Sequence, residues 1–256
     1  MHTYASSKFL YKSLFFVSVA IMAAKPIDHI PVGVAVIHNE EAAHSIRLNS
    51  HVRQFVKNYI RENRDVLHTV KLRSRLPFKT IDAVFAKYGL PKEIKYLAVV
   101  ESELKATALS HVGARGPWQL MPETAALLGL KITPDVDERT LYYKSTVAAA
   151  KYLRDLHDEF GDWLLVLAAY NGGTRNVYRA IHKAGSRNFW DLQYYLPAES
   201  REHVKKFIAS HYYFEGKGSV ATLTKAEWTA YVQSTPPIMY NAAPAWDYSA
   251  SVIVSR

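Results

Sequence analysis

The chain has 256 residues, of which 49% are hydrophobic and 21% charged, so it can form one good-sized core and is not a disordered chain. It contains no cysteine, which excludes a disulfide framework, thiol catalysis, cysteine metal sites and lipid attachment through an N-terminal cysteine. The formal net charge of +9 favours anionic surroundings such as a cell wall, a membrane surface or acidic glycans. Nucleic acid is not a predicted partner, because the sequence has no tight basic cluster and no nucleic-acid motif.

Residues 1–24 are predicted to be a signal peptide for export. Lys8 and Lys12 precede an apolar run, residues 14–24, that is too short for a comfortable membrane span and ends in small residues. Cleavage after this segment removes two lysines and no acid, so the charge falls from +9 to +7 (9 − 2). We therefore expect a soluble protein of the periplasm or cell envelope, with an uncleaved anchor as the less favoured alternative.

The first helices are predicted after a flexible lead-in over residues 25–48. Region 49–88 is predicted to be an N-terminal helical extension. One amphipathic helix starts near Ser50 behind a polar cap, and a second helix ends at Gly89, a residue typical of helix C-termini.

Region 89–215 is predicted to be the main domain and to be all-α, because no segment in it has strand periodicity. Its predicted elements are a helix from Pro91 to Glu101, a loop over 106–119, a short helix from Pro122 to Gly129, a long helix ending at Gly161, an apolar helix capped by Asp162 and broken at Gly172, and helices near 174–184 and 197–214. Region 216–256 is a tail rich in proline and aromatic residues, of unknown role, for which packing on the domain and a loose state are both left open.

Glu101 is the most informative residue of this domain. Ile94, Leu97 and Ala98 form one helical stripe, and the same spacing continues to Glu101. A charged residue in such a place is rarely buried without a partner. Desolvation favours the protonated form of a carboxyl group, which a general acid working near neutral pH requires. The alternative is that the helix frays at Val100 and Glu101 turns to solvent.

Two further polar segments, 116–119 and 169–171, could converge with Glu101 on one cleft. The amides of Gln119 and Asn171 could bind sugar hydroxyls and N-acetyl groups, and the Tyr170 hydroxyl could hold a protonated carboxyl in position. Gly116 would let the backbone approach a bulky substrate closely. Trp118 could stack on a sugar ring or belong to the core.

Four sequence blocks carry a family resemblance. They are Gly89-Leu90-Pro91-Lys92-Glu93 leading into Glu101-Ser102, the run Gly113-Ala114-Arg115-Gly116-Pro117-Trp118-Gln119-Leu120-Met121-Pro122, Gly161-Asp162-Trp163, and Ala169-Tyr170-Asn171-Gly172-Gly173. With these blocks, residues 50–215 resemble the lytic murein transglycosylases of the soluble-lytic-transglycosylase type, nearest to the membrane-bound D subgroup. The resemblance implies a lysozyme-like helical fold, shared with goose-type lysozyme, and makes 89–215 the catalytic domain.

The resemblance also implies an activity and a set of site residues. The activity is non-hydrolytic cleavage of the β-1,4 bond between N-acetylmuramic acid and N-acetylglucosamine, which leaves a 1,6-anhydromuramoyl end. Glu101 is implied as the single catalytic acid and base, with Tyr170 supporting it. The implied substrate-binding positions are Ser102, Ser110, Gly116, Gln119, Met121 through its backbone, Tyr170, Asn171 and His203.

The expected partner is the glycan strand of peptidoglycan, bound by a monomer that could also associate peripherally with the wall or membrane. No cofactor is expected. No metal is expected either, since none of the eleven histidines falls in a ligand spacing such as H-E-x-x-H.

Ordinary glycosidases need two carboxylates, whereas this reaction can proceed with a single acid. If the acetamido group or the 6-hydroxyl of the substrate attacks the anomeric carbon, the second carboxylate is unnecessary. Glu103 follows Glu101 by two residues, so on a helix it would point away. Two alternatives stay open: a hydrolase like goose-type lysozyme, and a peptidoglycan-binding protein without turnover.

His203 stands where the family normally carries a tyrosine. In the favoured interpretation it turns to solvent, and Tyr170 alone supports Glu101. In the other it reaches Glu101 and is neutral during turnover, because an imidazolium would hold the carboxyl ionised. Activity would then fall as pH drops through its titration.

Overall fold

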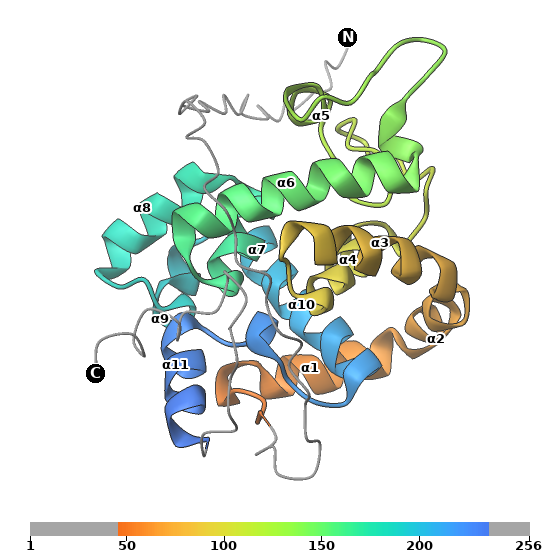
Figure 1. The fold of residues 1–256 in the computed structure, drawn as a ribbon. Helices are drawn as coiled ribbons and strands as arrows, with labels where there is room; N and C mark the ends of the chain where they lie inside the picture. The colour runs from red at the N-terminus through yellow and green to blue at the C-terminus, as the bar shows by residue number, and fades with distance from the viewer. Residues whose placement is uncertain (1–45, 236–256) are drawn as a thin grey trace, which may run out of the picture. The chain divides into compact units, whose positions relative to one another are not determined.

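The computed structural model describes residues 46–235 (Figure 1). Within that range the chain forms eleven α-helices, and extended pairing is confined to three isolated bridges, Leu109–Arg115, Arg115–Leu120 and Ile132–Asp137. The predicted all-α class is confirmed. The predicted signal peptide, most of the lead-in and residues 236–256 lie outside the described residues.

The helices follow one another with short connections, apart from the loops on either side of α5. In chain order they are α1 (Ser50–Glu62), α2 (Arg64–Arg73), α3 (Arg75–Tyr88), α4 (Tyr96–Ser102), α5 (Pro122–Leu127), α6 (Tyr142–Phe160), α7 (Trp163–Gly172), α8 (Thr174–Ala184), α9 (Phe189–Leu192), α10 (Ala198–Glu215) and α11 (Lys225–Ser234). Over the described residues, no helix has the length and apolar character needed to cross a membrane.

Helix α7 is the buried centre of the fold. Every residue from Trp163 to Ala169 is fully buried, and α6, α8 and α10 pack against it (Figure 1). Its first turn is capped by Asp162, whose Oδ1 accepts hydrogen bonds from the N–H groups of Leu164 and Leu165 at 2.9 and 3.3 Å. The predicted cap is confirmed. A helix that is apolar all round requires such burial on every side.

Helix α10 brings distant parts of the chain together. It packs against α1, α4 and α7. At Gly172, near the end of α7, an added Cβ would lie only 2.3 Å from the Ser200 hydroxyl of α10. The first turns of α10 therefore lie directly against the C-terminal end of α7.

The segment leading to Glu101 differs from its prediction. A 3₁₀ helix, Lys92–Lys95, precedes α4, and Pro91 is the N-cap of that helix and not part of the first turn of α4. Proline suits this place because it fixes φ and lacks an N–H group. Helix α4 continues through Ser102, so the alternative in which the helix frays at Val100 is wrong.

Helix α2 was not predicted, because only Leu67 and Val70 of its ten residues are buried and they give a weak apolar stripe.

The described part of the C-terminal tail packs on the helical domain. Helix α11 begins with a capping box between Thr224 and Glu227. The Glu227 carboxylate also accepts a hydrogen bond from the Trp190 indole N–H at 3.1 Å and one from Asn49, the N-cap of α1. The N–H of Lys225 donates to Asp162 at 2.7 Å, so the tail is attached to the cap of the central helix.

Buried His211 should make folding stability depend on pH. Burial lowers its pKa from 6.5 to about 4. Between these values the unfolded chain binds a proton that the folded chain does not, so stability is lost as pH falls from about 6.5 to about 4. The expected loss is up to about 3 kcal/mol.

Urea unfolding of wild type and His211→Gln at pH 7 and pH 4.5 measures this loss, which should shrink in the variant. Burial raises the pKa of Asp162 to about 6, so this residue stabilises the fold as pH falls, in the opposite direction to His211. Both proteins contain Asp162, and the difference between their losses removes its contribution. Exposed His68→Gln is the control. Equal losses in wild type and His211→Gln would contradict the assignment.

Candidate active site

Glu101 lies one residue before the end of α4 and is largely desolvated. Its side chain is 13% exposed, and its Oε1 lies 2.8 Å from Nε2 of His203 on α10, whose side chain is 8% exposed. The apolar residues of the predicted stripe, Ile94, Leu97 and Ala98, are fully buried. The favoured interpretation of His203 as a residue that turns to solvent is therefore wrong, because the packing of α10 on α4 directs the imidazole inward.

The hydrogen bonds around the His203 imidazole indicate which ring nitrogen carries the proton. Nδ1 of His203 is buried and has no hydrogen-bond partner among residues 46–235. With its proton on Nε2, a neutral ring donates to Glu101 Oε1 and leaves an unpaired acceptor at Nδ1. An imidazolium would instead bury an unpaired charged N–H, which costs more. We therefore infer the Nε2–H tautomer from the hydrogen-bond network.

The two carboxyl oxygens of Glu101 differ in their hydrogen bonds. Oε2 makes no hydrogen bond within the described part of the chain, whereas Oε1 is held by His203. A protonated carboxyl in this place would accept at Oε1 and carry its transferable proton on Oε2. This is the arrangement that a positioned general acid requires.

The loop between α4 and α5 joins Glu101 to α7. The hydroxyl of Ser102 donates to the carbonyl of Pro117 at 2.9 Å, and the next carbonyl, that of Trp118, accepts from the Tyr170 hydroxyl at 2.7 Å. The three predicted segments therefore converge. Tyr170 donates its single proton to Trp118, and the hydrogen bond to the Glu101 carboxyl comes from His203. Burial raises the pKa of Tyr170, and the nearby Glu101 charge raises it further.

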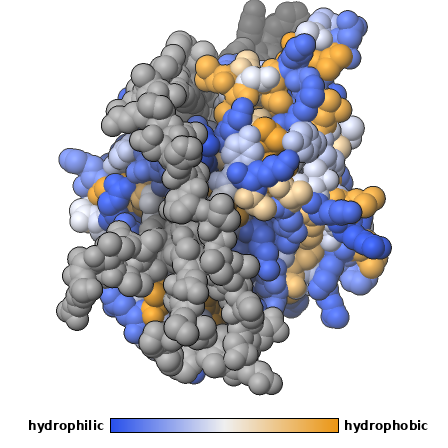
Figure 2. All heavy atoms as spheres, viewed as in Figure 1, coloured by the Kyte–Doolittle hydropathy of each residue, from blue (hydrophilic) through white to orange (hydrophobic). Residues whose placement is uncertain are grey.

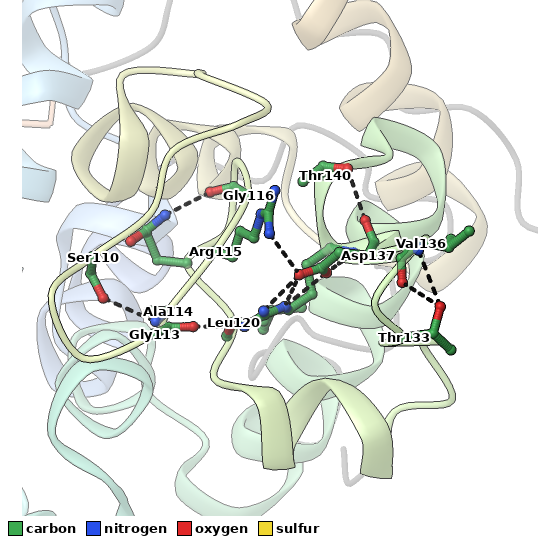
Figure 3. A network of polar contacts seen from close by, with 12 residues as sticks. Ser110, Gly113, Ala114, Arg115, Gly116, Leu120, Thr133, Val136, Asp137 and Thr140 are labelled. Atoms are coloured by element: carbon green, nitrogen blue, oxygen red, sulfur yellow. Dashed lines mark hydrogen bonds and ion pairs between the residues drawn. The ribbon is translucent and has the colours of Figure 1, made fainter.

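A buried ion pair holds this loop in place. Arg139 donates to the carbonyls of Gly113 and Leu120 at 2.7 and 3.0 Å and contacts Asp137 at 2.7 Å. Its guanidinium holds the pKa of Asp137 below the usual value. Figure 3 shows Ser110, Arg115 and Asp137 in the same network of contacts. Arg139 was not predicted as a site residue, because no local sequence pattern indicates contacts 19 and 26 residues away.

Several predicted substrate-binding side chains are engaged within the protein. Ser102 is buried, and its bond to Pro117 supports a role in fixing the loop rather than the expected sugar contact. The Ser110 hydroxyl accepts from the N–H of Ala114 at 2.9 Å, and the Gln119 amide donates to the carbonyl of Gly116 at 2.9 Å.

Asn171 is partly exposed, and Met121 is exposed at the N-cap of α5, so both stay available to a ligand. Trp118 is fully buried and donates to Thr146 at 3.0 Å, which excludes stacking on a sugar and assigns it to the core.

Gly116 has a different purpose from the predicted one. A Cβ at this residue would lie 1.9 Å from the carbonyl oxygen of Arg139, so the close approach is to the protein's own backbone and not to a substrate. Its φ of +82° is also a conformation that L side chains rarely adopt.

We expect Gly116→Ala to destabilise the fold by more than about 2 kcal/mol, from backbone strain and the clash together. Gly113→Ala is the matched control, because Gly113 has a φ of +87° but no atom within 4 Å of an added Cβ. Gly113→Ala should lower the free energy of unfolding only by the backbone strain, about 1 kcal/mol. Urea unfolding of both variants gives the comparison, and equal losses would show that the contact with Arg139 is unimportant.

Comparisons with known proteins show what the chain is similar to. Residues 80–193 match the family described as the transglycosylase SLT domain. The chain is 36% identical over 175 residues to the membrane-bound lytic murein transglycosylase D of Escherichia coli strain K12, an alignment that covers 66% of this chain and 38% of the relative. It is 38% identical over 101 residues to the transglycosylase of Enterobacteria phage PRD1, covering 39% of this chain and 36% of that protein. The chain thus spans less than two fifths of the length of either relative.

A solved structure has a similar fold. The 70 kDa soluble lytic transglycosylase of Escherichia coli aligns with a TM-score of 0.53 at 21% identity, over 71% of this chain and 33% of that one. At this level of identity the likeness shows the fold alone.

Proposed function

We propose that this chain, which belongs to the lytic transglycosylases of the SLT type, cleaves the β-1,4 bond between N-acetylmuramic acid and N-acetylglucosamine in peptidoglycan without consuming water. The observation that carries this proposal is the desolvated Glu101–His203 pair, with Nε2 and Oε1 2.8 Å apart. It provides one carboxyl group that is largely desolvated, oriented and hydrogen-bonded on one oxygen only.

The surroundings of Glu103, the next acidic residue in the sequence, support a mechanism with a single acid. Glu103 lies outside the helix, at the C-cap of α4 with a φ of 54°. Its carboxylate is paired with Lys105 at 2.8 Å and with Arg73 at 3.4 Å. It is therefore poorly placed as the nucleophile or base that ordinary glycosidases add to their acid.

The two halves of the reaction use the same carboxyl group. In the first, Oε2–H of Glu101 protonates the glycosidic oxygen as its bond to the anomeric carbon of N-acetylmuramic acid breaks. In the second, the carboxylate accepts the proton of the sugar's 6-hydroxyl as that oxygen bonds to the same carbon. His203 Nε2–H stabilises the carboxylate in between. The product is a 1,6-anhydromuramoyl end, and no water enters.

Two positions of the predicted substrate-binding set, Asn171 and Met121, are accessible to a glycan. We propose that the Asn171 amide and the backbone at Met121 contact the sugar chain, with Ser110 and Gln119 shaping the loop between α4 and α5. The export signal predicted over residues 1–24 lies outside the described residues. We also propose that the protein acts in the cell envelope, where peptidoglycan is found.

Digestion of purified peptidoglycan, followed by mass spectrometry of the soluble products, tests the reaction. The expected muropeptides are lighter than their hydrolysed counterparts by one water molecule, and borohydride should not reduce them because they have no free reducing end. Reducing-end sugars would instead indicate a hydrolase like goose-type lysozyme. Binding without any soluble product would indicate a peptidoglycan-binding protein without turnover.

A further inference from the structure

The bend between α2 and α3 exposes two leucines. Leu72 and Leu76 are 73% and 74% exposed, more than any other large hydrophobic residue between 46 and 235. They lie four residues apart, on either side of Ser74, where α2 ends and α3 begins. In Figure 1 this bend lies at the right-hand edge of the ribbon, where Figure 2 shows hydrophobic and hydrophilic surface side by side. Neither leucine takes part in the core.

The same segment carries a net positive charge. Residues 64–79 contain five Lys or Arg residues and one acid, Asp65, which gives a net charge of +4 (5 − 1). Arg64, Arg75 and Lys79 are exposed and form no ion pair with a described residue. The other two cations are engaged, since Lys71 lies over the Tyr213 ring and Arg73 is bonded to Glu103.

The bend is attached to the helix that carries Glu101. A guanidinium N–H of Arg73 donates to the carbonyl of Glu103 at 2.6 Å, and Glu103 is the C-cap of α4. A surface that binds the bend would therefore also fix the orientation of the C-terminal end of α4 relative to that surface.

We propose that this bend docks on an anionic phospholipid bilayer, with Leu72 and Leu76 at the boundary of headgroups and acyl chains and with Arg64, Arg75 and Lys79 against the phosphates. Exposed leucines among cations are the composition of surfaces that lie in a membrane interface. An anionic wall polymer would pair with the cations but would give the leucines no apolar partner. A second copy of the chain would place one +4 segment against another.

The chain has no cysteine, so a single introduced cysteine gives a unique label. The full chain carrying Leu72→Cys is labelled with a polarity-sensitive fluorophore and mixed with phosphatidylglycerol or phosphatidylcholine vesicles. The control is Leu127→Cys on α5, where the leucine is 69% exposed. We expect brighter, blue-shifted emission from position 72 with phosphatidylglycerol only, and no change at position 127.

Adding Arg75→Gln and Lys79→Gln should weaken this partitioning by roughly 25-fold, about fivefold for each cation. No change at position 72, an equal response at position 127, or an equal response to phosphatidylcholine would overturn the proposal. Release of products from soluble glycan fragments should be the same in all these variants. The docking surface is thereby tested separately from the reaction.

Discussion

Glu101→Gln is expected to reduce the release of soluble muropeptides by about 10²- to 10⁴-fold, which is the usual contribution of a positioned general acid. The amide can neither donate a proton to the glycosidic oxygen nor take one from the 6-hydroxyl. Its Oε1 can still accept from His203 Nε2–H, so the fold and the binding of insoluble peptidoglycan should be retained. Because the amide removes a carboxyl group from a desolvated place, the free energy of unfolding should not fall.

The matched control is Glu103→Gln, the same substitution two residues further on. This carboxylate is paired with Arg73 and Lys105 outside the helix, so its loss should leave the rate of release close to that of wild type. Chromatography of the released fragments and a pelleting assay with insoluble peptidoglycan measure turnover and binding separately. Turnover above a few per cent of wild type in Glu101→Gln would place the acid elsewhere.

The sequence predicted the features of this fold that depend on local interactions. The cap at Asp162 and the helix ends at Gly89 and Gly161 follow from backbone and side-chain preferences within one turn of helix. The burial of α7 follows from its apolar composition alone. Glu101 was also identified from a local pattern, because it is an acid that continues an apolar helical stripe.

The features that sequence could not predict depend on contacts between distant residues. His203 lies 102 residues from Glu101 at the edge of the apolar face of α10, and only the packing of α10 on α4 decides whether it faces the acid. Arg139 holds the loop through backbone carbonyls that any residue could supply. Gln119 adopts a φ of 45°, which is uncommon for a residue other than glycine and which no pattern indicates.

His203→Ala should lower the rate of product release by roughly 10- to 150-fold, which corresponds to the loss of a charge-assisted hydrogen bond worth about 1.5–3 kcal/mol. The imidazole N–H holds Oε1 of Glu101 at 2.8 Å and would stabilise the carboxylate between the two halves of the reaction. His203→Tyr should recover part of this loss, because a phenol O–H can donate to the same oxygen. Recovery in His203→Tyr and none in His203→Phe, which fills a similar volume without a hydrogen-bond donor, would identify a positioning role and not merely a filled volume.

The dependence of the rate on pH separates the imidazole from a phenol. Protonation at Nδ1 would give an imidazolium, which stabilises the Glu101 carboxylate and makes it a poorer base for the 6-hydroxyl proton. A loss of activity at low pH that depends on the imidazole should therefore be present in wild type and absent in His203→Tyr. The measurement is the rate of product release for wild type, His203→Tyr and His203→Ala, taken from about pH 4 to about pH 8 at intervals of about half a pH unit. Superimposable acidic limbs in all three proteins would remove His203 from the mechanism, since neither variant carries the group whose titration is proposed to cause the fall.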